Sequence, residues 1–171
     1  MKSVSAATIS PEQLQKLVRA ELDKTGHKAD SIGTPIKVTD FGEKKTDFLI
    51  VPITDNGKLV SVYRDDPMRS SVTLLASEAV LKSEKLPLFT LDGARREFAN
   101  HGFTGSDPIP VSFGPFSLFG VMGVGWLFPT KDSFVLLSLE GRMVTESDVA
   151  KFWPTRLESV RLAMNKIAPK P

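Results

Sequence analysis

The sequence predicts an α+β fold in which helices pack on an antiparallel sheet. Three observations favour this class. The chain has a well-capped amphipathic helix near its start, short segments in which apolar and polar residues alternate between turn residues, and apolar residues at helical spacing near its end. The chain has 171 residues, of which 41% are hydrophobic and 25% charged, as is typical of a globular protein. We expect a flexible N-terminus over residues 1–9, a single α+β domain over residues 10–168 and a tail over residues 169–171.

The first helix is expected over residues 10–24. Ser10 is a typical N-cap, Pro11 follows at the first helical position, and Gln13 completes a capping box. Gly26 is expected to end the helix. The apolar side chains that recur at helical spacing are Leu14, Leu17, Val18 and Leu22.

Three strands are expected next, over residues 35–39, 47–51 and 58–64. The sequence Asn56-Gly57 predicts a hairpin turn because both residues tolerate a positive φ. Pro52 has no backbone N–H, so we expect its strand to lie at an edge or to end there.

The middle of the chain gives weaker signals. A strand is expected over residues 72–75 and a helical turn over residues 77–81, and Pro87 then breaks the chain. Thr90 is expected to cap a second helix that Gly102 ends. The side chains expected to face inward from this helix are Leu91, Ala94 and Phe98.

The last part of the chain predicts one strand and two helices. The strand covers residues 133–139 and is closed by Glu140 and Gly141. Ser147 is expected to cap a short helix that Pro154 interrupts, and Thr155 to cap the last helix. The apolar face of that last helix consists of Leu157, Val160, Met164 and Ile167.

The order of these elements hints at internal repetition. Residues 10–66 and residues 90–141 are candidate sub-units, each with one helix followed by a strand meander on which it lies. A helix followed by a three-stranded meander resembles the PepSY-like and cystatin-like modules, more in the first half than in the second. The resemblance implies a protein that binds or inhibits rather than catalyses, and it implies no particular site residues.

Side chains that support catalysis are sparse. The absence of cysteine excludes disulfides, zinc–thiolate sites and cysteine nucleophiles within this chain. His27 and His101 are far apart and lack metal-ligand spacing, and the glycines from Gly120 to Gly125 reverse the spacing of the dinucleotide fingerprint. We predict no catalytic residue, no cofactor and no metal, and we favour a protein that is not an enzyme.

The charge pattern bears on partners and on compartment. Lys and Arg number 22 against 20 for Asp and Glu, a net charge of +2, and the two signs are interspersed, so we expect no nucleic-acid partner. No transmembrane segment is expected either. The compartment stays open: the cytoplasm is favoured, while Ser5-Ala6-Ala7 also fits a periplasmic or secreted chain that has lost a leader.

One segment departs from the ordinary pattern. Residues 108–130 contain no charged side chain but many glycines and aromatic rings. They fit a buried pair of strands, an apolar surface for a partner or hydrophobic ligand, or a membrane-inserting loop, although their prolines and glycines oppose a spanning helix. The candidate interaction residues in this segment are Phe113, Phe116, Phe119, Trp126 and Phe128.

The favoured function is therefore a non-catalytic protein-interaction or ligand-binding module, accessory or inhibitory in role. Its partner is expected to be another protein or a second copy of the chain. One alternative is a small metal-independent enzyme that uses carboxylates in a cleft. A second alternative is binding of a hydrophobic ligand or a membrane surface through residues 108–130.

Overall fold

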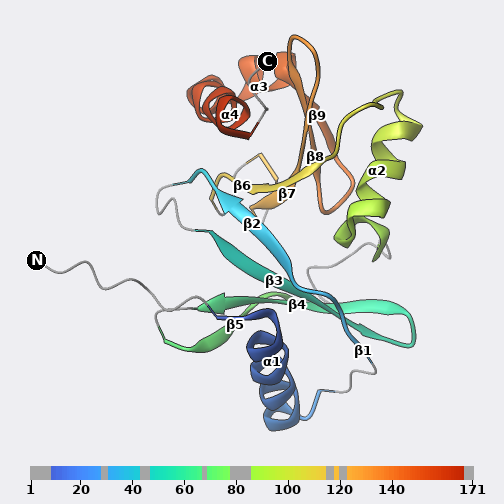
Figure 1. Ribbon diagram of the computed structural model, residues 1–171, viewed down its shortest axis with the longest axis vertical. Helices are drawn as coiled ribbons and strands as arrows, with labels where there is room; N and C mark the ends of the chain where they lie inside the picture. Colours follow the sequence, from blue (N-terminus) through green and yellow to red (C-terminus); the bar gives the residue numbers. More distant parts are fainter. Residues whose placement is uncertain are drawn as a thin grey trace, which may run out of the picture. The chain divides into compact units, whose positions relative to one another are not determined.

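A computed structural model describes residues 9–27, 31–42, 47–66, 69–77, 86–114, 118–119 and 123–167 of the chain and confirms the α+β class (Figure 1). Its strands pair mostly in the antiparallel sense. The chain divides into two compact units, which we describe separately. Unit 1 holds Met1–Lys37 and Phe48–Glu84, and unit 2 holds Val38–Asp47 and Lys85–Pro171. The single domain over residues 10–168 stays a prediction.

Helix α1 (Pro11–Thr25) forms as its capping signals predict. The hydroxyl of Ser10 accepts the N–H of Gln13 at 3.2 Å, and the Gln13 amide oxygen accepts the N–H of Ser10 at 3.0 Å. These two bonds satisfy backbone donors that the helix itself leaves unpaired. Gly26 ends the helix at a φ of 70°, which glycine adopts without strain.

The sheet of unit 1 is antiparallel. Strands β3 (Phe48–Asp55), β4 (Lys58–Asp66) and β5 (Ser71–Ser77) form a meander, and the two-residue strand β1 (Ser31–Ile32) pairs with β3. The predicted hairpin joins β3 to β4 through Asn56 and Gly57, at φ values of 50° and 74°. Strand β5 extends beyond the predicted residues 72–75, and most of the turn predicted over residues 77–81 lies outside the described residues.

Strand β3 neither ends at Pro52 nor lies at an edge, so both expectations for that residue are wrong: β4 pairs with one side of the strand and β1 with the other. It continues to Asp55, and Pro52 lies opposite Val62 of β4. The Pro52 carbonyl accepts the N–H of Gly33 at 2.8 Å, so the backbone polar groups of Pro52 face the short strand β1 rather than β4. The missing N–H therefore costs no bond to β4, and the strand passes through the proline.

Helix α1 covers one face of this sheet. Its buried side chains Leu14, Val18 and Leu22 pack against Val51, Ile53 and Tyr63. Val51 and Ile53 are two residues apart on β3 and so point to the same face of the sheet. The apolar side chains that recur at helical spacing on α1 therefore pack against apolar side chains at alternate positions of the strands.

Unit 2 is built on a sheet whose order is β2, β6, β7, β8, β9. Strands β6 (Ile109–Ser112), β7 (Val124–Pro129), β8 (Phe134–Ser138) and β9 (Met143–Thr145) form an antiparallel meander. Strand β2 (Ile36–Asp40) pairs with β6 in the parallel sense, with Thr39 opposite Val111. The predicted antiparallel pairing therefore holds for most strands, and β2 with β6 is a parallel pair within a mixed sheet.

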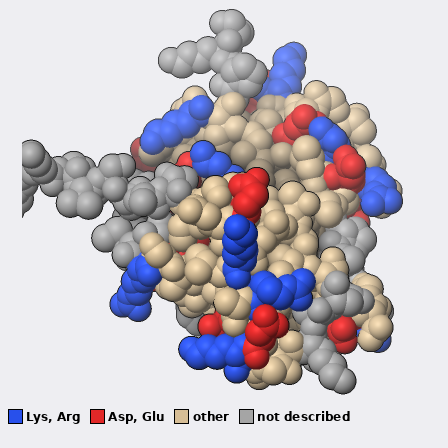
Figure 2. Space-filling view, turned by 60° about the horizontal axis from the view of Figure 1, so that its bottom comes forward, with Lys and Arg blue, Asp and Glu red and all other residues tan. Residues whose placement is uncertain are grey.

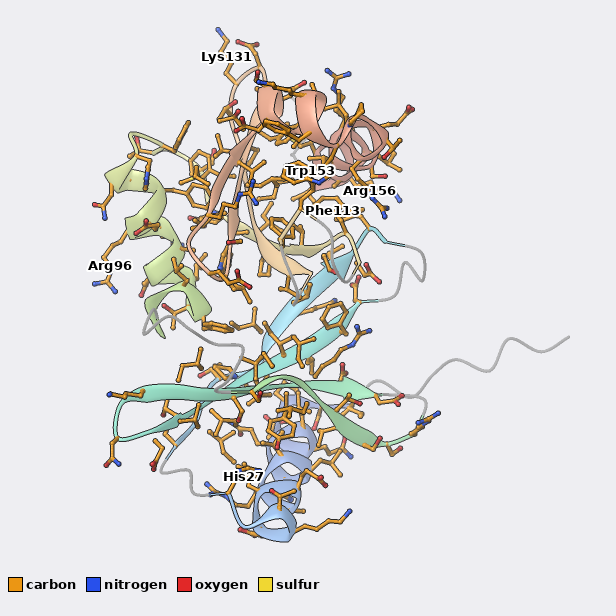
Figure 3. The ribbon with its side chains drawn as sticks, turned by 180° about the vertical axis from the view of Figure 1, so that it is seen from behind. His27, Arg96, Phe113, Lys131, Trp153 and Arg156 are labelled. Carbon is orange, nitrogen blue, oxygen red and sulfur yellow. The ribbon has the colours of Figure 1, made fainter. Side chains whose placement is uncertain are left out.

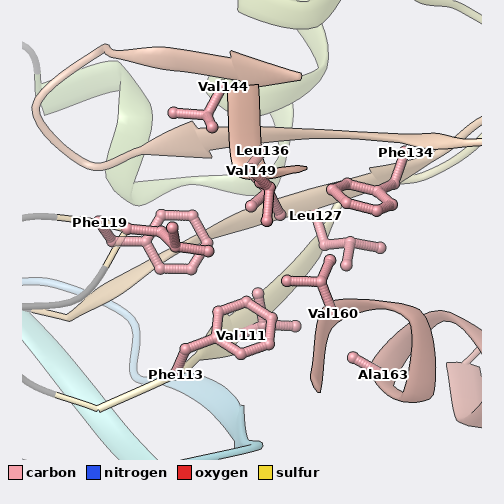
Figure 4. Close-up of a cluster of buried hydrophobic side chains, with 11 residues drawn as sticks. Val111, Phe113, Phe119, Leu127, Phe134, Leu136, Val144, Val149, Val160 and Ala163 are labelled. Carbon is pink, nitrogen blue, oxygen red and sulfur yellow. The ribbon is translucent and has the colours of Figure 1, made fainter. Parts of the chain in front are cut away.

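Helical elements cover both faces of the unit 2 sheet. The short 3₁₀ helix η1 (Leu86–Phe89) and helix α2 (Leu91–Asn100) contact one face, where Phe98 packs on Phe128 with ring centroids 5.0 Å apart. Helices α3 (Glu146–Phe152) and α4 (Pro154–Ile167) contact the other face, where Val149 and Val160 join a buried cluster with Leu127 (Figure 4). A sheet buried on both faces accounts for the uncharged strands of this unit.

Three helix details differ from the sequence prediction. Leu91 is exposed, whereas Leu88 and Phe89 of η1, just before α2, are buried. Thr145, not Ser147, caps α3. Its hydroxyl oxygen accepts the N–H of Asp148, and the Asp148 carboxylate accepts the N–H of Thr145. Helix α4 starts with Pro154 itself, and so Thr155 lies inside it.

One carboxyl group in unit 1 is buried. Asp65 of β4 is 5% exposed, and one of its oxygens accepts the N–H of Leu49 at 2.9 Å. Burial raises the pKa of this carboxyl, while the Leu49 bond and the nearby charge of Arg64 act in the opposite direction. The Arg64 guanidinium lies 3.8 Å from the centre of the Phe48 ring. The charged form of Asp65 therefore opposes folding.

We expect Asp65→Asn to raise the melting temperature at pH 7, because it keeps an acceptor for the Leu49 N–H and removes the buried charge. A carboxyl whose pKa is raised by folding supports stability below its unfolded pKa of about 4 and loses that support as the pH rises through the folded pKa. The gain should therefore vanish near pH 4. Thermal unfolding followed by circular dichroism across this range measures it.

The matched control for this change is Asp66→Asn, one residue further on, where the carboxylate is more exposed and lies 3.8 Å from Arg69. The control should retain the pH dependence of the unaltered protein. A lower melting temperature for Asp65→Asn at pH 7 would show instead that the bonds of the charged form outweigh its burial.

Candidate functional site

The uncharged segment 108–130 forms the central strand pair of unit 2. Strands β6 and β7 pair from Ile109 opposite Leu127 to Ser112 opposite Val124. Four of the five candidate aromatic residues are buried, and Phe116 lies outside the described residues. The buried four are Phe113, Phe119, Trp126 and Phe128. The described rings thus contribute to the interior, as a buried strand pair requires.

The structure divides these rings between the two faces of the sheet. Phe113 and Phe119 pack together, with centroids 5.6 Å apart, in the cluster beneath α3 and α4. Figure 3 shows Phe113 on the side of the sheet that also carries Trp153. Trp126 and Phe128 face the other way, because alternate residues of a strand point to opposite faces.

The face that carries Trp126 has one buried polar contact. The indole N–H of Trp126 donates to the carbonyl of Leu88 at 2.7 Å, which attaches η1 to the sheet. A buried indole N–H without an acceptor would be costly, so this bond fixes where η1 lies. Trp126 therefore has a structural role in unit 2.

Gly125 explains how Phe119 fits. A Cβ at Gly125 would lie 2.5 Å from the Phe119 ring and 2.6 Å from the Leu137 carbonyl oxygen, closer than real side chains come. The glycine therefore leaves a place on β7 into which the ring packs. This glycine marks a close approach within a strand, as the buried-strand interpretation of the segment expects.

A groove in unit 2 lies between the end of β2 and α4, and we call it the α4 groove. It encloses about 400 Å³. Apolar side chains of Phe41, Leu162 and Ile167 line it together with the carboxylates of Asp40 and Asp47 and the amine of Lys166. Sequence reasoning missed this site because its walls come from distant parts of the chain. The one sequence feature that could have indicated the groove is Leu162, an apolar residue outside the apolar face predicted for the last helix.

The polar groups of the α4 groove are positioned by the local backbone. One oxygen of Asp40 accepts the N–H of Gly42 at 2.8 Å, which holds the carboxylate at the turn after β2. Phe41 continues the parallel pairing, since its N–H donates to the Ser112 carbonyl at 2.8 Å. The wall of the groove at the end of β2 is therefore hydrogen-bonded to the sheet, and the opposite wall is one face of α4.

A second hollow lies beside the end of α2, and we call it the α2 depression. It encloses about 500 Å³ over Ala99, Phe103 and Phe128. Arg95 at its rim donates to Asp107 and to Asp92, each at 2.9 Å. The Arg95 bond holds the pKa of the Asp107 carboxyl below its usual range. These exposed ion pairs fasten the loop after α2 and leave the guanidinium engaged with protein carboxylates.

Groups typical of catalytic or metal sites do not converge within the described residues. No three His, Asp or Glu side chains there lie close enough together to hold a metal ion. His27 lies just beyond α1 in unit 1 (Figure 3), and His101 caps α2 in unit 2, where its Nδ1 lies 2.9 Å from the Glu97 carbonyl oxygen. The buried carboxyl of Asp65 borders neither hollow. The carboxylate-enzyme alternative stays a prediction.

The surface charges are mixed, as the sequence predicts. Figure 2 shows Lys and Arg side chains next to Asp and Glu side chains across the face in view. Within the described residues, no helix has both the length and the apolar character needed to cross a membrane.

We expect Gly125→Ala to lower the free energy of unfolding by about 1–3 kcal/mol, because the added methyl group meets both the Phe119 ring and a backbone oxygen. Phe119→Leu, which removes the ring, should cost less in the Gly125→Ala background than in the unaltered protein. Urea unfolding of the two single variants and the double variant measures this coupling. Strictly additive losses would contradict the packing of the ring on the glycine.

Comparisons with known proteins give no match to this chain among family models, curated proteins or solved structures. The likeness to PepSY-like and cystatin-like modules therefore stays a prediction. The case for function rests on the geometry of the chain itself, and above all on the two hollows of unit 2.

Proposed function

We propose that this protein is a non-catalytic binding module that takes a short segment of a partner protein in the α4 groove. The observation that carries the proposal is the side chain of Leu162, which is 45% exposed and lines a concave site with Phe41 and Ile167. An apolar side chain of a partner would cover this surface and remove it from water.

The charges of the groove favour a particular kind of segment. Among the described residues that border the groove, Asp40 and Asp47 bring two carboxylates and Lys166 brings a single amine. A basic residue beside the apolar anchor would meet this excess of negative charge, and an acidic one would be repelled. We therefore propose a segment that combines one large apolar side chain with an adjacent Lys or Arg.

The α4 groove suits this role better than the α2 depression does. In the depression, Arg95 and Asp107 already bind each other, and Phe128 beneath them is buried. In the groove, Leu162 keeps nearly half of its surface in water. Burying such a side chain at the centre of an interface is worth roughly 1.5–3 kcal/mol.

Selection from a random-peptide display library on the full chain tests the proposal. We expect the selected peptides to share a large apolar residue next to a basic one, and to bind in fluorescence anisotropy measurements. Leu162→Asp should weaken that binding by about tenfold or more, because it removes the apolar anchor site.

Leu91→Asp is the matched control, since Leu91 is also an exposed leucine on a helix of unit 2 and is 38% exposed. It should leave peptide binding unchanged. The proposal is wrong if no consensus emerges from the library, or if the Leu162 and Leu91 variants bind the peptides equally well.

A further inference from the structure

The turn between α3 and α4 carries two neighbouring aromatic side chains of unit 2. Helix α3 ends at Phe152 and α4 begins at Pro154, so Trp153 is the single residue between the two helices. Phe152 is 58% exposed, more than any other large apolar side chain among the described residues. Its ring lies edge-on to the Trp153 ring, with centroids 6.0 Å apart. We call Phe152 and Trp153 the corner rings.

The backbone and the core hold this corner in place. The N–H of Trp153 donates to the Val149 carbonyl at 2.9 Å, and the Trp153 carbonyl accepts the N–H of Arg156 at the same distance. The Trp153 side chain is half-buried and packs against the cluster beneath α3 and α4. The core therefore anchors one corner ring, and that ring supports the other where it is exposed to water.

Each corner ring has a cation over it. The Lys151 amine lies 5.1 Å from the centre of the Phe152 ring, and the Arg142 guanidinium lies 5.4 Å from the centre of the Trp153 ring. Both cationic residues are exposed. A cation at this range over an aromatic face is attracted by the ring, so the two charges stay beside the apolar surface.

The Asp148 carboxylate beside these cations is already bound. It accepts both the backbone N–H and the hydroxyl of Thr145, each at 2.9 Å, within the capping box of α3. These two bonds, and after them the charges of Arg142 and Lys151, hold the pKa of the Asp148 carboxyl below its usual range. Asp148 therefore offsets one of the two cations and leaves positive charge for an outside partner.

We propose that the corner rings and their two cations bind this protein to the surface of a lipid membrane that carries anionic headgroups. Phe152 enters the boundary between headgroups and acyl chains, and Trp153 lies at headgroup level, the position that tryptophan favours at a membrane surface. Lys151 and Arg142 reach the anionic headgroups, since long cationic side chains keep their charge in the polar layer while their stems lie along apolar surface.

The shape of this corner favours a lipid surface over a protein or a nucleic acid. Neither the α4 groove nor the α2 depression is lined by a corner ring. A protein partner would have to supply a matching pocket for the exposed ring, and a single-stranded nucleic acid is held in a groove that follows its backbone. A fluid lipid layer takes up an exposed ring beside cations without such a pocket.

Co-sedimentation of the full chain with vesicles tests the proposal. We expect binding to phosphatidylcholine vesicles that contain about one third phosphatidylserine, weaker binding at high salt, and little binding to phosphatidylcholine alone. Because a single shallow anchor binds a membrane weakly, half of the protein should be bound at roughly 0.1–1 mM lipid. Lipids with brominated acyl chains should quench the fluorescence of half-buried Trp153 and spare that of buried Trp126.

Phe152→Gln tests the contribution of the exposed ring. It removes the ring without adding a charge, and it should raise the lipid concentration needed for half-binding by about tenfold or more. Leu91→Gln is the matched control, because Leu91 is also an exposed apolar residue on a helix of unit 2. It should leave vesicle binding unchanged.

Lys151→Glu tests the contribution of charge. It should weaken binding to phosphatidylserine-containing vesicles by a similar factor and flatten the salt dependence. Lys131→Glu makes the same change in net charge and should leave binding nearly as it was. Figure 3 shows Lys131 at the tip of the hairpin between β7 and β8, apart from Trp153.

All four variants should keep the circular dichroism spectrum of the unaltered protein, because each replaces an exposed side chain. The proposal is wrong if the chain does not sediment with anionic vesicles, if Phe152→Gln binds them as well as the unaltered protein does, or if Lys131→Glu weakens binding as much as Lys151→Glu. A chain that ignores vesicles and binds a labelled oligothymidylate would overturn it in favour of a nucleic-acid partner.

This inference is independent of the proposed function, because the corner rings do not line the α4 groove. Leu162→Asp should keep vesicle binding, and Phe152→Gln should keep binding to the selected peptides. Failure of either proposal can therefore be told apart from failure of the other.

Discussion

The fit of the Phe119 ring against Gly125 is the constraint on which much of unit 2 depends. The ring takes the space that a side chain on β7 would fill, and it brings Phe113 into the same cluster. Leu127 and Leu136 continue that cluster along the sheet, and α3 and α4 close over it through Val149 and Val160. A side chain at position 125 would therefore disturb the sheet and both helices at once.

The opposite face of the same strand is held in a different way. There a single buried hydrogen bond, from the Trp126 indole to Leu88, attaches η1, and ring packing of Phe98 on Phe128 attaches α2. A strand that is buried on both faces has no room for a charged residue, which gives the uncharged segment its physical reason. The segment lacks charged side chains because its strands lie in the middle of the unit 2 sheet, with both faces buried.

Among the described residues, the large apolar side chains that are exposed lie on α2, α4 and β5 and at the end of α3, outside this interior. Leu162 lines the α4 groove, and Leu74 lies on the outermost strand of unit 1. The α4 groove combines its apolar surface with charged residues nearby, which is the combination that gives a contact both affinity and selectivity.

The sequence by itself determined the elements whose signals are local. The capping box of α1, the positive-φ hairpin at Asn56 and Gly57, and the inner stripe of α4 all depend on neighbours within a few residues. Tertiary structure decided the rest: the parallel pairing of β2 with β6, the passage of β3 through Pro52, and the α4 groove. Each of these joins segments that are far apart in the chain, and no local pattern encodes which distant strand or helix a residue will meet.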